Sequence, residues 1–179
     1  DQAAEKIAAL KYVLTNTIKE YNLQAVAFQC WDELQFQLGI CSCFAHALIT
    51  DEGTPISCES DIHGAISSLM LQEASMFDEP TFFADLTIRH PENDNAELLW
   101  HCGAFPPSLS NNKNETKIGD HFVLPSHAPG TCNWQLKKGD ITVIRFDGSH
   151  GEYSLFCGEG KAIDGPYTLG TYVYLEVND

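Results

Sequence analysis

The sequence predicts an α+β fold, in which an α/β layer of short strands and helices is followed by a small antiparallel β-barrel or sandwich. Helical and strand-like apolar patterns alternate over residues 1–75, which is typical of an α/β layer. After residue 120, short apolar runs are separated by turn residues, which is typical of a small antiparallel barrel or sandwich. Hydrophobic residues make up 44% of the 179 residues, enough for a folded core.

The first part of the chain alternates helix and strand. Apolar residues recur at three- and four-residue steps over residues 3–21 and predict an amphipathic helix. The mostly apolar run 24–30 predicts a short strand covered on both faces. The following elements are expected to be a helix at 31–38 ended by Gly39, a helix at 41–50, a turn at 51–55, a strand at 56–58 and a helix at 62–74.

The alternation of helix and strand ends near residue 80, and strand-like stretches separated by loops follow. Strand-like stretches at 82–88 and 98–100 flank a hairpin loop at 91–95, and the polar stretch 106–115 predicts a loop or hinge. Later strands are expected at 122–124, 131–136, 141–146, 153–157 and 172–177. We therefore expect two domains, an α/β portion at 1–105 that carries the acidic motifs and a β-rich, barrel-like portion at 106–179.

The chain is strongly acidic, with a formal net charge of −15. Phosphate backbones and anionic lipids repel such a protein, so neither nucleic acid nor membrane is an expected partner. Divalent cations and neutral polyols remain compatible with this charge. No apolar run is long enough to span a membrane, and the first residues lack the basic start and apolar core of a signal peptide. We therefore expect a cytoplasmic protein.

Seven cysteines fit that compartment. Their number is odd and several lie in apolar strand-like runs, which predicts free, buried thiols. A zinc site is the alternative, but Cys41 and Cys43 are too close for the usual CxxC spacing and no second pair mirrors them. In a cytoplasmic protein the glycosylation sequon at 114–116 would stay unmodified.

Acidic residues follow two of the predicted strands. Asp32 and Glu33 come after the first strand, and Glu59 and Asp61 come after the second. Because ligand sites of open α/β sheets form beyond the carboxyl ends of strands, these side chains could face each other if the strands are neighbours. Converging carboxylates suit a hard divalent ion such as Mn²⁺ or Mg²⁺. Structural roles remain open, since Asp61 could be a helix N-cap and Glu33 a solvated helix residue.

A histidine also lies at a predicted strand end. His101 follows the apolar residues 98–100 and precedes Gly103 by two positions, so a ligand could approach it closely. A structural histidine is the alternative interpretation. The sequence contains no nucleophile elbow, no dinucleotide-binding glycine motif and no P-loop, which argues against the corresponding hydrolases, dehydrogenases and nucleotide-binding proteins.

Five motifs in order resemble one family. They are Gln29-Cys30-Trp31-Asp32-Glu33-Leu34, Gly39-Ile40-Cys41-x-Cys43, Asp51-Glu52-Gly53-x-Pro55, Cys58-Glu59-x-Asp61-x-x-Gly64-Ala65 and Trp100-His101-Cys102-Gly103. Together they are similar to the C-terminal part of L-fucose isomerase-related proteins, the L-fucose/L-arabinose isomerase family. The strongest match covers residues 24–104, and residues 120–179 resemble the family only in strand rhythm and turns.

This resemblance implies a metal-dependent aldose–ketose isomerase, an intramolecular oxidoreductase of carbohydrate metabolism with an ene-diol mechanism. It implies that Mn²⁺, or another divalent cation, is held by Glu33 and Asp61, which would also be the catalytic pair. Glu59 is the alternative ligand if the arabinose-type pattern applies. Trp31 and His101 would line the pocket of the monosaccharide substrate.

The resemblance also implies that these residues are an incomplete part of a longer isomerase. The family has an additional N-terminal domain and a metal-binding histidine beyond the β-rich portion, and its members assemble as homo-oligomers. The chain alone is therefore expected to bind metal poorly. Two other hypotheses are a non-catalytic sugar-binding or regulatory relative, and a purely structural domain.

Overall fold

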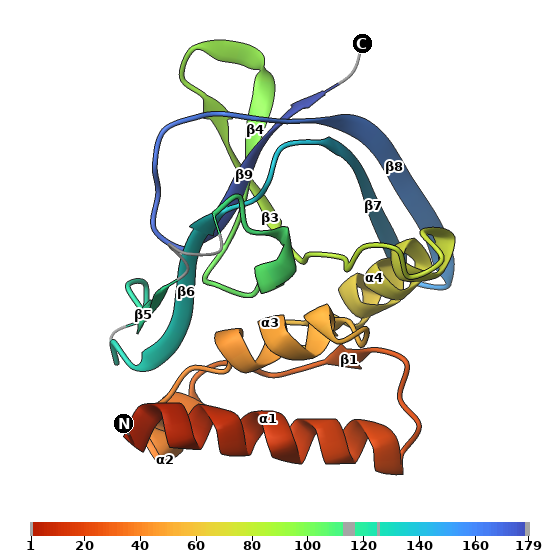
Figure 1. Cartoon of the computed structure of the whole chain (residues 1–179). Coiled ribbons are helices and arrows are strands. Elements are labelled where there is room, and N and C mark those ends of the chain that lie inside the picture. The colour runs from red at the N-terminus through yellow and green to blue at the C-terminus, as the bar shows by residue number, and fades with distance from the viewer. Residues whose placement is uncertain (1, 113–116, 125, 178–179) are drawn as a thin grey trace.

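The helices of the first part and the strands of the second form adjoining layers in the computed structural model, which describes residues 2–112, 117–124 and 126–177. The elements are α1 (Gln2–Glu20), β1 (Val26–Ala27), α2 (Glu33–Leu38), α3 (Cys43–Asp51), β2 (Ile56–Ser57), α4 (Ile62–Ala74), β3 (Asp85–His90), β4 (Asn93–His101), η1 (Pro107–Leu109), β5 (Lys117–Asp120), β6 (Pro129–Gln135), β7 (Asp140–Ser149), β8 (Glu152–Ile163) and β9 (Thr171–Val177). In Figure 1, α1 lies at the base, α3 lies between α1 and the strands, and α4 lies against β7.

The α/β layer is confirmed. Strands β1 and β2 pair in parallel, with Val26 opposite Ile56, and α1 packs on α3 through two small clusters around Ile7 and Ile18. Helix α2 ends at Gly39, whose left-handed backbone (φ 68°) lets its N–H bond to the carbonyl of Gln35. None of the described helices is long and apolar enough to cross a membrane.

Strand β9 organises the β-rich part. It pairs with β4 along one edge, while β6 pairs with Thr171 and Tyr172 on the other edge and β8 pairs with residues 174–177. A buried apolar cluster forms beneath this junction. Its members are Leu99, Phe105, Leu109, Leu136, Ile141, Ala162, Val173 and Leu175.

The sheet stays open. Of the described strands, β7 pairs only with β8, and its other side faces α4, where the N–H of Phe146 donates to Oγ of Ser67 at 2.9 Å. The neighbour of β7 on this side is therefore a helix and not another strand, and no closed barrel is found among the described residues. The α+β class is confirmed, whereas closure into a barrel is not. Because β4 pairs with β9, the sheet also crosses the predicted boundary at residue 105, and the division into two domains stays a prediction.

Several predicted boundaries are wrong for identifiable reasons. The expected strand at 122–124 is not formed, because Nδ1 of His121 accepts the backbone N–H groups of Val123 and Leu124 at 3.2 and 2.9 Å. Strand β3 begins at Asp85, after Phe82 and Phe83, which instead pack into buried clusters. Strand β4 begins within the expected hairpin loop. The loop predicted at 106–115 is described only to residue 112, and the sequon at 114–116 lies outside the described residues.

Candidate functional site

The two acidic motifs start at one edge of the β1–β2 pair. Because the strands are parallel neighbours, residues 30–33 and 58–61 leave the sheet at the same end, as expected for a site beyond carboxyl strand ends. Backbone bonds continue this pairing, since Phe28 donates to the carbonyl of Ser57 at 2.9 Å and Ser60 donates to that of Phe28 at 3.1 Å. The fold therefore brings together the two segments that carry the predicted acids.

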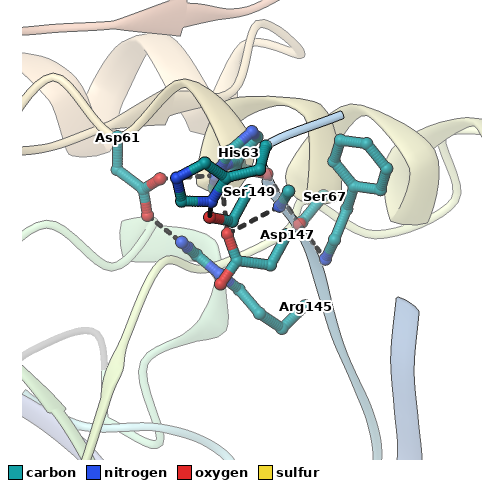
Figure 2. A network of polar contacts seen from close by, with 10 residues as sticks. Asp61, His63, Ser67, Arg145, Asp147 and Ser149 are labelled. Atoms are coloured by element: carbon teal, nitrogen blue, oxygen red, sulfur yellow. Dashed lines mark hydrogen bonds and ion pairs between the residues drawn. The ribbon is translucent and has the colours of Figure 1, made fainter. Parts of the chain in front are cut away.

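Asp61 is the N-cap of α4. Its Oδ1 accepts the N–H of Gly64 at 2.9 Å, and its Oδ2 accepts a hydrogen bond from Nη1 of Arg145 on β7 (Figure 2). Partial burial raises the pKa of Asp61, but these hydrogen bonds outweigh it and hold the pKa below its usual value. The structural role that the sequence left open, helix capping, is thus present, and it does not exclude a second role.

Glu33 is placed differently. It is the first residue of α2, its side chain is exposed, and its Oε2 accepts from the amide of Gln37 one turn along the helix at 3.4 Å. Among the described residues, no three His, Cys, Asp or Glu side chains lie close enough together to hold a metal ion. As they stand, Glu33 and Asp61 do not form a metal site, and their assignment as ligands stays a prediction.

Glu59 and Asp85 contribute further carboxylates to this edge. Desolvation raises the pKa of Glu59, and the negative charges of Asp85 and Asp61 raise it further, while a hydrogen bond with Trp31 acts in the opposite direction. Glu59 and Ser60 both have left-handed backbones (φ 61° and 57°), which non-glycine residues rarely adopt and which cluster at functional sites. The turn after β2 therefore combines a strained backbone at Glu59 and Ser60 with a carboxylate that neighbouring acids repel.

His101 is a buried polar group near this edge. Its side chain is 2% exposed, and neither ring nitrogen has a hydrogen-bond partner among the described residues. Burial lowers the pKa of His101, Asp85 opposes this effect and His121 adds to it, so the ring is neutral at pH 7. Buried polar atoms are almost always paired, and the two ring nitrogens of His101 depart from this rule.

The backbone after His101 requires a glycine. Gly103 has a φ of 135°, and a Cβ at this position would lie 2.2 Å from the backbone nitrogen of Cys132 in β6. This close approach fixes the end of β4 against β6 and so fixes the position of His101. The sequence prediction linked Gly103 to ligand access, whereas the structure shows packing between two strands.

A cavity beside the acidic edge has a mostly apolar wall that does not match a sugar. It has a volume of about 850 Å³ and includes Asp85 and Arg145 in its wall. The rest of the wall is mostly apolar, with residues such as Leu71, Leu99 and Phe156. A monosaccharide needs many hydrogen-bond partners, so the interior of this cavity does not suit the sugar ligand that the sequence predicts.

All seven cysteines are free, which confirms the predicted thiols, although Cys157 is exposed. Sequence reasoning missed Asp85, Arg145 and Asp147 as neighbours of the acidic edge. Arg145 is one of only two arginines in the chain and lies within a predicted strand, which is a weak signal that could have drawn attention to it.

No family model matches the chain. It is 33% identical over 180 residues to proteins named sulfoquinovose isomerase from Priestia aryabhattai and Priestia megaterium, an alignment that covers 99% of this chain and 39% of each relative. A sulfoquinovose isomerase from Alkalicoccus urumqiensis is 33% identical over 167 residues, covering 93% of this chain and 37% of that relative.

The chain thus spans less than two fifths of the length of these curated relatives. Their names agree with the predicted similarity to sugar isomerases. They specify sulfoquinovose, however, and give no support to the narrower resemblance to L-fucose isomerase. Metal dependence and oligomerisation are not addressed by these names.

Proposed function

We propose that this chain is part of an aldose–ketose isomerase, and that its substrate is a sulfonated aldose of the sulfoquinovose type. The observation that carries this proposal is the 33% identity to sulfoquinovose isomerases over nearly the whole chain. The acidic edge with the unpaired His101 nitrogens supports the location of the site. Cytoplasmic location and homo-oligomerisation belong to the same proposal.

Two neighbouring carboxylates provide an acid and a base. An aldose becomes a ketose when a base removes the proton from C2, an ene-diol forms, and a proton is returned to C1. The pKa of Asp61 is lowered by its bonds to Arg145 and Gly64, whereas the pKa of Glu59 is raised by desolvation and by Asp85. Environments that shift two pKa values in opposite directions separate a base from an acid, so we assign Asp61 as the base and Glu59 as the acid.

Two other predicted residues suit contact with the sugar. Trp31 is 45% exposed and hydrogen bonds with Glu59, so its ring can cover one face of a sugar beside the acid. His101 is neutral and buried, and its nitrogens can exchange hydrogen bonds with sugar hydroxyl groups. Both roles stay those that the sequence predicted.

Mn²⁺, or another divalent cation, remains the proposed cofactor, with Asp61 and Glu33 as proposed ligands. The described geometry does not fit this ion as it stands, because Asp61 is bonded to Arg145 and Glu33 lies on the surface. A cation could bind Oδ2 of Asp61 only if the hydrogen bond between Arg145 and Asp61 were broken.

A non-catalytic sugar-binding or regulatory relative is the second candidate. The unpaired His101 nitrogens would serve such a protein equally well, because they concern binding and not proton transfer. The two candidates differ in one result. A binding relative retains sugar affinity and produces no ketose, whereas an isomerase loses turnover when Glu59 or Asp61 is neutralised.

The test uses the complete gene product that contains these residues, with ketose formation from sulfoquinovose, L-fucose and L-arabinose followed by NMR in the presence of Mn²⁺. We expect turnover of sulfoquinovose and a loss of at least about 100-fold in Glu59→Gln and Asp61→Asn. Glu52→Gln is the control, because the side chain of Glu52 is exposed and pairs with Lys11 on the surface. Sugar binding without any ketose would support the second candidate, and neither binding nor turnover would overturn both.

A further inference from the structure

Cys30 and Cys58 lie just beyond the carboxyl ends of the two parallel strands, and we call this pair the dithiol. Cys58 follows β2 directly, and Cys30 lies three residues after the end of β1. Their side chains pack in one buried cluster with Ala104, and the two thiol groups share a hydrogen bond. The next residue in each segment, Trp31 or Glu59, belongs to the candidate site. The dithiol therefore links the bases of the two turns that carry this site.

Cys30 is the more reactive member of the dithiol. It is also the more accessible one, since Cys30 is 6% exposed and Cys58 is 0% exposed. Hydrogen bonds from the Cys58 thiol and from the backbone N–H of Glu59 lower the pKa of Cys30 and outweigh the opposing effect of burial. The shared hydrogen bond and burial both raise the pKa of Cys58. Because the thiolate is the nucleophilic form of cysteine, Cys30 is the member that reacts first with an oxidant.

Neighbouring cysteines are kept protonated by burial. Burial raises the pKa of Cys102 to about 12, although Cys102 is more exposed than Cys30. It also raises the pKa values of Cys43 and Cys132. A thiol whose pKa lies far above 7 stays protonated at neutral pH and reacts slowly. The shared hydrogen bond therefore distinguishes the dithiol from the thiols around it.

We propose that the dithiol is a modification site, at which a small neutral peroxide joins Cys30 and Cys58 in a disulfide. This inference goes beyond the proposed isomerase activity and does not depend on it. Because Cys30 is almost completely buried, a small uncharged oxidant such as hydrogen peroxide reaches it more easily than a bulky or charged one. Closing the bond needs little displacement, since the two sulfur atoms move from hydrogen-bond distance to about 2 Å.

The oxidation takes place in two steps. In the first, the Cys30 thiolate attacks one oxygen of hydrogen peroxide, so that an S–O bond forms, the O–O bond breaks, and the leaving hydroxide is protonated to water. In the second, the Cys58 thiol attacks the sulfenic sulfur of Cys30, so that the S–S bond forms and the S–O bond breaks. The leaving hydroxide takes the proton of the Cys58 thiol. Two thiols and one peroxide thus give one disulfide and two water molecules, and a thiol reductant reverses the change.

Peptide mapping by mass spectrometry, without reducing agent, tests the proposal on the complete gene product that contains these residues. After treatment with hydrogen peroxide at pH 7, we expect two peptides joined through Cys30 and Cys58, lighter by two hydrogen atoms and separated again by dithiothreitol. The free thiol of Cys30 should disappear about tenfold faster than that of Cys102. Cys58→Ser should leave Cys30 as a sulfenic acid, which dimedone traps. Cys102→Ser is the matched control and should form the disulfide as the unsubstituted protein does.

The unsubstituted protein alone can overturn the proposal, so a variant that fails to fold does not decide it. Cys30 and Cys58 thiols that stay free while the exposed Cys157 is oxidised would contradict it, as would a disulfide between Cys30 and Cys102. A Cys30 that stops at the sulfinic acid would show that Cys58 does not complete the reaction, and would also overturn it. Ketose formation is measured in a separate assay, so the isomerase proposal can stand when this one fails, and the reverse.

Discussion

The backbone N–H of Gly64 donates to Oδ1 of Asp61 at 2.9 Å, and a Cβ at position 64 would lie 2.5 Å from Oδ2 of the same carboxylate. The absence of a side chain at Gly64 is thus what lets the Asp61 carboxylate fold over the start of α4. The same hypothetical Cβ would lie 2.5 Å from the ring of Phe83. One glycine therefore sets the position of the candidate base.

Gly64→Ala is predicted to destabilise the protein by roughly 1–2 kcal/mol, because the clash with Asp61 and Phe83 outweighs the gain of about 1 kcal/mol that alanine brings to a helix. It should also lower isomerase activity by displacing Asp61. Urea unfolding and the sugar assay measure the two effects. In Gly158→Ala the new Cβ would meet its nearest atoms at 3.4 Å, and stability should change by about 0.5 kcal/mol or less. A stabilised Gly64→Ala would contradict the proposed packing.

Local sequence patterns predicted the helices well. Helix α4 lies at the predicted residues, since its apolar positions recur at helical spacing and Asp61 caps its start. The end of α2 at Gly39 could also be predicted from the sequence, because a glycine can adopt the left-handed conformation that the end of this helix requires. Short-range signals of this kind suffice where the interaction lies within one turn.

The long-range contacts of the candidate site could not be predicted from local sequence patterns. The bond between Asp61 and Arg145 spans 84 residues, and it depends on how β7 is placed against α4. Likewise, Asp85 approaches Glu59 only because β3 follows a non-strand segment that packs Phe82 and Phe83. Such contacts depend on sheet register and packing, which leave no local pattern in the sequence.

Glu59→Gln is predicted to stabilise the fold at pH 7 by roughly 0.5 kcal/mol or less, given that Glu59 is exposed. The folded-state pKa of Glu59 is raised, so the folded protein binds its proton more readily and loses stability as pH rises through that pKa. The advantage of glutamine should therefore disappear below the ordinary pKa of 4.5. Thermal unfolding at pH 7 and pH 4 measures the difference.

Glu33→Gln provides the comparison. Glu33 is exposed and its side chain bonds to Gln37 of its own helix, so stability should not change beyond the usual range of surface substitutions. If Glu33→Gln instead abolished activity while Glu59→Gln retained it, the assignment of Glu59 as the acid would be wrong. Such a result would favour the predicted ligand role of Glu33.

His101→Leu is predicted to retain stability and to lose sugar binding. Both nitrogens of His101 are unpaired, and replacing an unpaired buried polar group by an apolar one of similar size is nearly neutral. His121→Leu should behave in the opposite way. It removes the acceptor of the Leu124 N–H and should cost roughly 1–3 kcal/mol. Urea unfolding and sugar titration of both variants measure this contrast, and a strongly destabilised His101→Leu would refute a ligand-binding role.

Acidification is predicted to destabilise the protein from about pH 6.5 downward. Desolvation lowers the pKa of His46 to about 3, and it also lowers the pKa values of His101 and His121. Below the ordinary histidine pKa of 6.5 the unfolded chain binds protons that the folded protein does not, so stability falls with pH. Each such histidine contributes up to about 1.4 kcal/mol per pH unit.

His46→Phe identifies one part of this pH dependence. His46 is fully buried, lies edge-on to Phe28 with ring centroids 4.8 Å apart, and has one nitrogen without a partner. Its replacement by phenylalanine should make the fall in unfolding free energy between pH 6 and pH 4 shallower, even if stability at pH 7 changes through altered packing. Urea unfolding at several pH values measures the slope for both proteins. Equal slopes would mean that His46 takes up its proton without unfolding, which its burial and the direction of its pKa shift argue against.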